Sequence, residues 1–350
     1  MRGRAVLLGL VLLAILGFVF LRGPSPHIQI KAEVLASLGP VNITNTMVTS
    51  WIVVALLIVL VFLLTRRWEL VPRGPQNFVE AVVEAFFNLA SQMVGERLAR
   101  RFLPVTATIF FFILFANWFS LAPVFNAIGL VKEVVPSEEG AAHEGKAFVM
   151  EKVDLGPLPI AFTLPSSPDR LQGEAIELNE PEAETKVEEK RAEGKLVGEF
   201  LPFLRSMNTD VNMPLALAVA ASIAVEYWGI SALGLGAYGR TFFNFGKLGR
   251  GLRSLRPMAI MEGAVDAFVG LLELVSHLVR LVSFTFRLFG NMFAGEVVIL
   301  MFTFLVPLLL TLPFYGLELF VGIVQAFIFA ALTLVFGLGA VEHAAAGEHH

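Results

Sequence analysis

Residues 258–306 read MAIMEGAVDAFVGLLELVSHLVRLVSFTFRLFGNMFAGEVVILMFTFLV. Over these 49 residues no proline interrupts an apolar pattern with helical spacing, so the stretch predicts one long helix. At 1.5 Å per residue this helix is roughly 73 Å long, whereas the hydrocarbon core of a bilayer is about 30 Å thick. We therefore expect it to be steeply tilted, bent or hairpinned, and a steep tilt needs a partner surface. Residues 307–342 pose the same problem more mildly.

The whole chain is too apolar for a soluble protein. Hydrophobic residues make up 56% of the 350 and charged residues 16%, where a soluble domain carries about 45–50% and 25%. The absence of cysteine excludes disulfides, thiolate metal sites and cysteine nucleophiles, and the net charge of −4 gives no basic field for nucleic acid. The predicted fold class is an all-α polytopic membrane protein with about five to six membrane helices.

Basic residues set the expected orientation. Arg2 and Arg4 place the N-terminus in the cytoplasm, whether the apolar run at 5–21 is a signal sequence or a minimal membrane helix; both remain open. The stretch from Tyr238 to Pro257 carries five basic residues and no acid, which is typical of a cytoplasmic loop.

These signals divide the chain into successive segments. They are a signal-like or extra membrane helix (1–23), an outer segment (24–45), a membrane helix (46–66), a cytoplasmic amphipathic surface helix (67–101), a membrane helix (102–123), an acidic outer-side insertion (124–210), a membrane helix (211–236), a basic cytoplasmic loop (237–257), two long tilted helices (258–306 and 307–342) and a tail (343–350). Between Lys132 and Glu199 the insertion holds 16 acidic and 8 basic side chains and shows little apolar periodicity. For much of it we expect disorder or a loose cap.

Ionisable side chains interrupt the apolar pattern of residues 258–306. Such groups are costly in lipid and usually face water or another polar group. At 100° per residue one polar stripe forms, made of Glu273, Arg280, Ser283, Arg287 and Asn291. Glu296 lies about 180° around the helix from Arg287 and roughly 13–14 Å along it, so it belongs to a different polar space.

Two further polar residues, Glu318 and Gln325, are seven positions apart and share a helix face. The alternative for all these groups is that they merely satisfy one another inside a helix bundle. Arg287 argues against it, because a guanidinium among phenylalanines cannot be neutralised by losing its proton.

The segment Arg287-Leu-Phe-Gly-Asn-Met-Phe-Ala-Gly-Glu296 resembles the signature of subunit a of the F-type ATP synthase. The similarity extends over most of the chain through shorter motifs, which are Ile43-Thr-Asn-Thr46, Gln76-Asn-Phe-Val-Glu80, Asn208-Thr-Asp-Val-Asn212, Leu272-Glu-Leu-Val-Ser276, Gln325-Ala-Phe-Ile-Phe329 and Glu342-His343. The chain departs from the family in its long insertion near 125–205, in the apolar run at 5–21, and in Glu318, where some relatives have histidine.

The resemblance implies the stator subunit of the membrane F0 sector, in which two long helices press against a rotating c-ring. Two aqueous half-channels would pass protons to and from the ring and couple their flow to ATP synthesis. Arg287 would face the ring carboxyl. The outer half-channel would be lined by Asn291, Glu296, Glu318 and Gln325, and Glu273, His277 and Arg280 would lie nearer the cytoplasmic exit. His277 is equally interpretable as a proton relay or a surface-seeking histidine.

By the same resemblance the chain is no enzyme by itself but a proton-translocating component of the complex. Its expected partners are the c-ring, the b subunits of the peripheral stalk and membrane lipid, with no nucleic acid, cofactor or metal. It would be a multi-pass protein of the cell inner (plasma) membrane with a cytoplasmic C-terminus. The alternative is a secondary ion transporter, but its repeated halves are not found. An intramembrane hydrolase would need a Gly-x-Ser-x-Gly, His-Glu-x-x-His or cysteine motif, which the sequence lacks.

Overall fold

A computed structural model describes isolated positions before residue 30 and then residues 30–66, 69, 74–122, 125–126, 128–133, 146–150, 160–162, 175–177, 183–242, 246–254, 257–306 and 309–346. The chain forms two compact units. Unit 1 comprises Met1–Leu56, Phe115–Asp210 and Gly290–Gly322, and unit 2 comprises Leu57–Leu114, Val211–Phe289 and Ile323–His350. The segment expected at 1–23 lies almost entirely outside the described residues, as do the last four residues of the tail.

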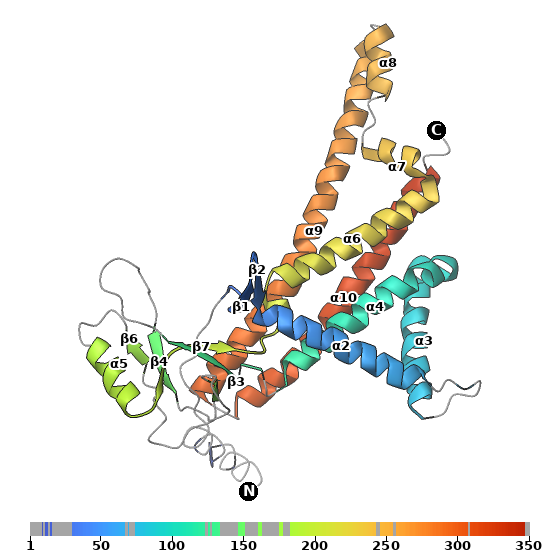
Figure 1. Cartoon of the computed structure of the whole chain (residues 1–350). Coiled ribbons are helices and arrows are strands. Elements are labelled where there is room, and N and C mark those ends of the chain that lie inside the picture. The colour runs from blue at the N-terminus through green and yellow to red at the C-terminus, as the bar shows by residue number, and fades with distance from the viewer. Residues whose placement is uncertain are drawn as a thin grey trace. The chain divides into compact units, whose positions relative to one another are not determined.

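Five helices in the described part of the chain are long and apolar enough to cross a membrane. They are α2 (Asn45–Thr65), α4 (Glu96–Ser120), α6 (Asn212–Leu233), α9 (Pro257–Leu305) and α10 (Thr311–Ala346) (Figure 1). Large apolar side chains stay exposed along them, for example Phe62 on α2 and Phe268 on α9. Since so much apolar surface requires lipid or partner proteins, the predicted fold class is confirmed: this is an all-α polytopic membrane protein.

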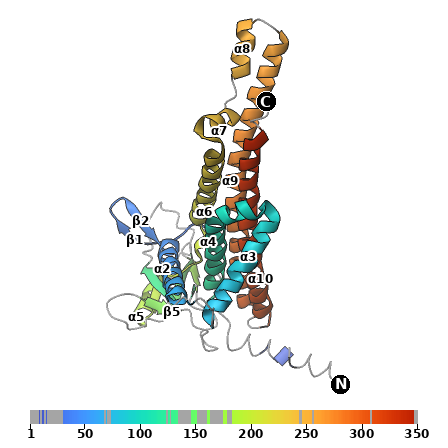
Figure 2. The same ribbon diagram turned by 90° about the vertical axis from the view of Figure 1, so that its right-hand side faces the viewer.

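Helix α9 is unbroken over 49 residues in both views (Figures 1 and 2). It covers the stretch that the sequence predicts, shifted by one residue. The only proline of α9 is Pro257 at its first position, where the missing N–H would have no helical partner and therefore costs nothing.

The predicted surface helix at 67–101 is interrupted at Gly95. There α3 (Pro75–Val94) ends and α4 begins, because Gly95 has a φ of +79°, which side-chain-bearing residues rarely adopt. Its N–H donates to the carbonyl of Ser91 and closes the last turn of α3. Phe86, Ala90 and Val94 are buried at four-residue spacing, so α3 is amphipathic as predicted, whereas Phe78 near its start is exposed.

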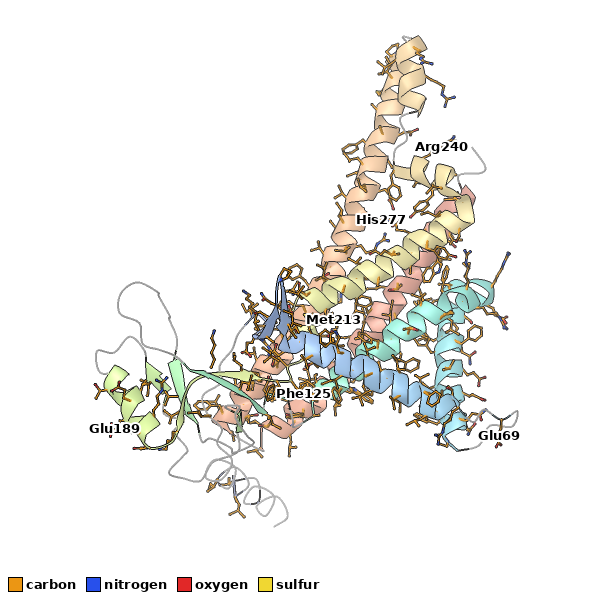
Figure 3. The ribbon with its side chains drawn as sticks, viewed as in Figure 1. Glu69, Phe125, Glu189, Met213, Arg240 and His277 are labelled. Carbon is orange, nitrogen blue, oxygen red and sulfur yellow. The ribbon has the colours of Figure 1, made fainter. Side chains whose placement is uncertain are left out.

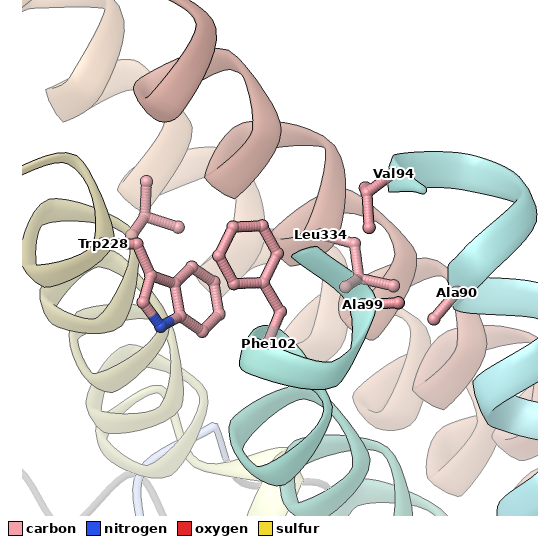
Figure 4. Packing of buried hydrophobic residues seen from close by; sticks show 7 residues of the cluster. Ala90, Val94, Ala99, Phe102, Trp228 and Leu334 are labelled. Carbon is pink, nitrogen blue, oxygen red and sulfur yellow. The ribbon is translucent and has the colours of Figure 1, made fainter. Parts of the chain in front are cut away.

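The core of unit 2 is built around two stacked rings. Phe102 of α4 lies over Trp228 of α6 with centroids 4.1 Å apart and planes inclined by 24° (Figure 4). Their companions in this cluster come from α3, α4, α6 and α10: Ala90, Val94, Ala99, Val225 and Leu334. Four helices of unit 2 thus share one apolar core.

The basic stretch at 237–257 contains two short helices, α7 (Leu235–Phe242) and α8 (Gly246–Ser254), where the sequence suggested a loop. Gly234, with a φ of +80°, ends α6, and its N–H donates to the carbonyl of Ile230. The chain can therefore turn and start a new helix at once.

The acidic insertion contains a folded sheet. Its strands are β3 (Ile128–Glu133), β4 (Lys146–Met150), β5 (Ile160–Phe162), β6 (Ala175–Glu177) and β7 (Leu196–Pro202), all antiparallel in the order β5-β3-β7-β4-β6, with α5 (Ala183–Ala192) beside them. Ile176, Val187 and Val197 form a small core. The expectation of disorder or a loose cap is wrong for these stretches, because strands of three to seven residues are too short to give a clear period.

Two smaller elements complete unit 1. A hairpin of β1 (Val34–Leu38) and β2 (Val41–Thr44) turns at Gly39, whose φ is +63°, and leads directly into α2. A short 3₁₀ helix, η2 (Met207–Thr209), connects the sheet to α6.

Candidate functional site

Arg287 lies on α9 at the border between a packed face and an exposed face. Phe284 and Leu288 beside it are buried, and Phe284 packs on Phe329 of α10 with ring centroids 4.7 Å apart. On the other side Phe286 is 58% exposed. The guanidinium reaches back to Ser283, where Nη2 donates to Oγ over 3.4 Å. No described carboxylate of unit 2 lies within ion-pair distance of Arg287, so its charge is available to a partner.

A second polar group, which we call the His277 cluster, comprises Glu273, His277 and Arg280 of α9, Glu226 of α6 and Tyr238 of α7. Figure 3 labels His277. Its Nδ1 lies 2.5 Å from Glu226 Oε1, and its Nε2 lies 3.3 Å from Glu273 Oε1. Because a carboxylate only accepts hydrogen bonds, His277 Nδ1 is the donor to Glu226, while its Nε2 faces a second carboxylate. Tyr238 donates to the other oxygen of Glu226 over 2.5 Å.

Tyr238 and Arg280 complete the cluster from two sides. Burial, together with the hydrogen bond to Glu226 and its charge, raises the pKa of Tyr238 above its ordinary value of 10, so the phenol remains a donor at neutral pH. The guanidinium carbon of Arg280 lies 3.8 Å from the ring centroid of Phe336 on α10, at a distance where a cation is attracted to the ring face.

The His277 cluster opens into a pocket of about 240 Å³ within unit 2. Four helices line it with Leu233, Tyr238, Thr241, Phe242, Glu273, His277, Arg280, Val335, Phe336, Gly339 and Ala340. This volume accommodates several waters, since each occupies about 30 Å³ in the liquid. The site therefore combines proton-carrying side chains with room for water.

A third polar group surrounds Glu296 in unit 1. Asn126 Nδ2 donates to Glu296 Oε1 over 2.8 Å, and Arg205 Nη2 lies 3.6 Å from Glu296 Oε2. A Cβ built on Gly295 would overlap the carboxyl of Glu318, so the Glu318 side chain lies directly against the α9 backbone. Glu318 of α10 thus lies at the level of Gly295, one residue before Glu296 in α9.

The remaining predicted site residues are Asn291, which is exposed on α9, and Gln325, which is buried on α10. Among the residues that the structure describes, no group of three or more histidine, aspartate or glutamate side chains could hold a metal ion.

Two of the shorter sequence motifs meet in unit 1. Thr46 donates to Asp210 Oδ2 over 3.0 Å, and nearby Asn208 donates to Asn117 Oδ1 over 2.6 Å. Asn45, Thr46, Asn117 and Asn208 are all buried. The motifs beginning at Ile43 and at Asn208 are therefore joined by the hydrogen bond between Thr46 and Asp210.

Sequence reasoning missed Asn126, Arg205, Glu226 and Tyr238. Glu226 could have been found, because it is an acid inside an apolar predicted span, the same signal that identified Arg287. Arg205, Asn126 and Tyr238 lie outside the long apolar runs, where a polar residue carries no such signal.

The family described as ATP synthase A chain matches residues 47–337. ATP synthase subunit a of Gloeobacter violaceus is 27% identical over 324 residues, which cover 92% of this chain and 94% of that relative. ATP synthase subunit a of Moorella thermoacetica is 26% identical over 299 residues, covering 85% of this chain and 91% of the relative. Because the family match spans most of the sequence and includes α9 with Arg287, the chain belongs to the ATP synthase A chain family.

Proposed function

We propose that the chain is the stator of the F0 sector and passes protons through two aqueous half-channels to and from a rotating c-ring. One observation carries this proposal. Along α9 the unneutralised guanidinium of Arg287 follows the His277 cluster and precedes Glu296, so a fixed cation stands between two groups of proton-carrying side chains.

Arg287 would act on the carboxyl of each c subunit. A fixed cation favours the carboxylate form, so a protonated ring site releases its proton on arrival. The same charge repels cations that would otherwise pass directly between the half-channels. The membrane potential supplies about 2.3 kcal/mol per charge for each 100 mV. In this role the chain moves protons and performs no bond-making chemistry of its own.

Each half-channel would use one of the polar groups. The outer one would be lined by Asn291, Glu296, Glu318 and Gln325, of which Glu318 packs on α9 at Gly295, next to Glu296 in the chain. The cytoplasmic one comprises the His277 cluster and its pocket, in which His277 exchanges protons between Glu273 and Glu226. The contacts of His277 favour its interpretation as a relay over that of a surface-seeking histidine.

The proposed function also implies which partners the chain contacts and which segments face the cytoplasm. The exposed apolar side chains of α9 offer a surface to the c-ring. Further contacts are with lipid and with the b subunits of the peripheral stalk. The basic stretch around α7 and α8 would face the cytoplasm, as would the C-terminus, in the inner (plasma) membrane of the cell.

Arg287→Ala tests the proposed function. In vesicles carrying the whole complex, gradient-driven ATP synthesis should be abolished while the complex still assembles. Arg287→Lys should fail substantially as well, because lysine can lose its proton and lacks the planar fork. The matched control is Arg100→Ala, which removes an exposed guanidinium paired with Glu96 and should leave synthesis unchanged. Normal synthesis with Arg287→Ala would refute the proposal.

A further inference from the structure

The acidic insertion begins and ends beside one carboxylate. Asn126 precedes β3 and Arg205 follows β7, and these two strands are hydrogen-bonded neighbours. Their pairing continues beyond the strands, since the N–H of Phe203 donates to the carbonyl of Ile128 and the N–H of Asn126 to the carbonyl of Leu204. The two ends of the insertion therefore form one double-stranded base.

Both ends of this base contact Glu296. Asn126 Nδ2 donates to Oε1 over 2.8 Å, whereas Arg205 Nη2 lies 3.6 Å from Oε2. The side chains of Arg205 and Glu296 are only 6% and 13% exposed. Each carboxylate oxygen thus faces a different end of the insertion.

Arg205 is held in place by two other segments of unit 1. Its backbone N–H donates to Thr49 Oγ1 on α2 over 3.3 Å, and its Nη1 donates to the carbonyl of Lys31 over 3.2 Å. Because a guanidinium keeps its charge throughout the accessible pH range, Arg205 is a permanent cation beside Glu296. Glu318 of α10 lies against the α9 backbone at Gly295, the residue before Glu296, and a negative charge there would oppose the effect of Arg205.

The contacts with Glu296 lie apart from the apolar core of the insertion. Its sheet has a core of its own, made of Ile176, Val187 and Val197. Asn126 also has a φ of +55°, a conformation that most side-chain-bearing residues avoid and asparagine tolerates. Asn126 is thus both the residue with the positive φ and the residue whose side-chain amide donates to Glu296.

We propose that Asn126 and Arg205 are positioning residues for Glu296, and that through them the insertion sets the pH range over which the outer half-channel accepts protons. The inference rests on the proposed function, in which Glu296 takes up protons from the outer side. A guanidinium and an amide donor both favour the carboxylate.

The test uses the whole complex in vesicles whose lumen corresponds to the outer side. ATP synthesis is measured against luminal pH at fixed external pH and membrane potential, and then against external pH at fixed luminal pH. Arg205→Met should move the luminal profile upward by roughly one pH unit or more, as expected when a carboxylate loses an adjacent cation. Asn126→Leu should move it in the same direction by less. The external profile should stay in place for both variants.

Two further variants distinguish the effect of the Arg205 charge on the luminal profile from the effect of its packing. Arg205→Lys should restore most of the luminal profile. In the double variant Arg205→Met with Glu296→Gln, the effect of the arginine should disappear, because no carboxylate remains for it to act on.

Three outcomes overturn the inference: an unmoved luminal profile at normal membrane levels, equal movement of both profiles, or the failure of all Arg205 and Asn126 variants to reach the membrane. The last would make the two residues purely structural. Arg287→Ala in the same vesicles separates this inference from the proposed function. If it abolishes synthesis while Arg205→Met leaves the luminal profile in place, only the inference fails; if it leaves synthesis intact, the proposed function fails.

Discussion

The absence of a side chain at Gly295 allows the carboxyl of Glu318 to pack against the backbone of α9. The Cα of Gly295 leaves space for the carboxyl of Glu318, and a Cβ there would overlap that carboxyl. Gly295→Ala should therefore displace Glu318 and reduce proton flow through the outer half-channel several-fold, as measured by passive and ATP-driven proton flux. Gly290→Ala is the matched control on the same helix, because its Cβ would meet nothing within 4 Å. Equal flux in the two variants would contradict the close packing of Glu318 on α9.

Glu226 is the member of the His277 cluster on α6. Glu226→Gln keeps the size of the side chain but removes the charge that faces the imidazole, so His277 no longer stands between two carboxylates. Proton flux should fall several-fold, and its dependence on cytoplasmic-side pH should change while its dependence on outer-side pH stays the same. Glu96→Gln, at an exposed ion pair, should alter neither. Full flux with an unchanged cytoplasmic-side profile would remove Glu226 from the ion path.

Single site residues could be predicted where an ionisable side chain lies in an apolar run. Arg287, Glu296 and Glu318 are such residues, and the free-energy cost of an ionisable group in lipid indicates a function. Asn126 and Tyr238 could not be found in this way, because their importance comes only from the carboxylates that the fold brings to them.

At the level of helices, α10 packs on its neighbours through a glycine. A Cβ at Gly337 would approach within 2.7 Å of the Trp228 ring, which is already stacked on Phe102. Gly337→Ala should therefore destabilise unit 2 by about 1–3 kcal/mol through overpacking. The measurement is the thermal unfolding midpoint in detergent, which should fall.

Gly316→Ala is the control for that variant, since it lies on the same helix and its Cβ would meet nothing. It should leave the midpoint unchanged or raise it, because alanine favours a helix by up to about 1 kcal/mol over glycine. A fall of the same size in both variants would show that crowding at Trp228 is not the cause.

Helix existence was easier to predict than helix ends. Long apolar runs define α2, α4, α6, α9 and α10, since their composition alone requires lipid. The boundary between α3 and α4 was predicted six residues too late because charged residues continue beyond Gly95, from Glu96 to Arg101. Gly95 acts through its positive φ, which no periodicity reveals.

For the whole molecule, the insertion raises the question of how much of it transport requires. Replacing residues 134–197 by a short glycine-containing turn would join β3 to β7 as a hairpin and keep Asn126 and Arg205 in place. ATP-driven proton pumping should remain near its normal rate. Loss of pumping at normal membrane levels would show that the removed part of the sheet has a direct role.

The membrane part of the molecule was largely predictable, and the insertion was not. A membrane helix can be recognised in the sequence by a run of about 20 consecutive apolar residues. The strands of the insertion are short, and Ile176, Val187 and Val197 of its core come from three different elements, so no local window contains the pattern.

The length of α9 bears finally on the order in which the chain can enter the bilayer during synthesis. An ordinary span leaves the insertion machinery as a self-sufficient apolar helix of about 20 residues. α9 is not self-sufficient, because His277 depends on Glu226 of α6, and Arg280 and Phe284 depend on rings of α10. The ribosome makes α6 earlier but α10 later. We therefore expect α9 to lack part of its stabilising contacts until α10 has been translated and packs against it.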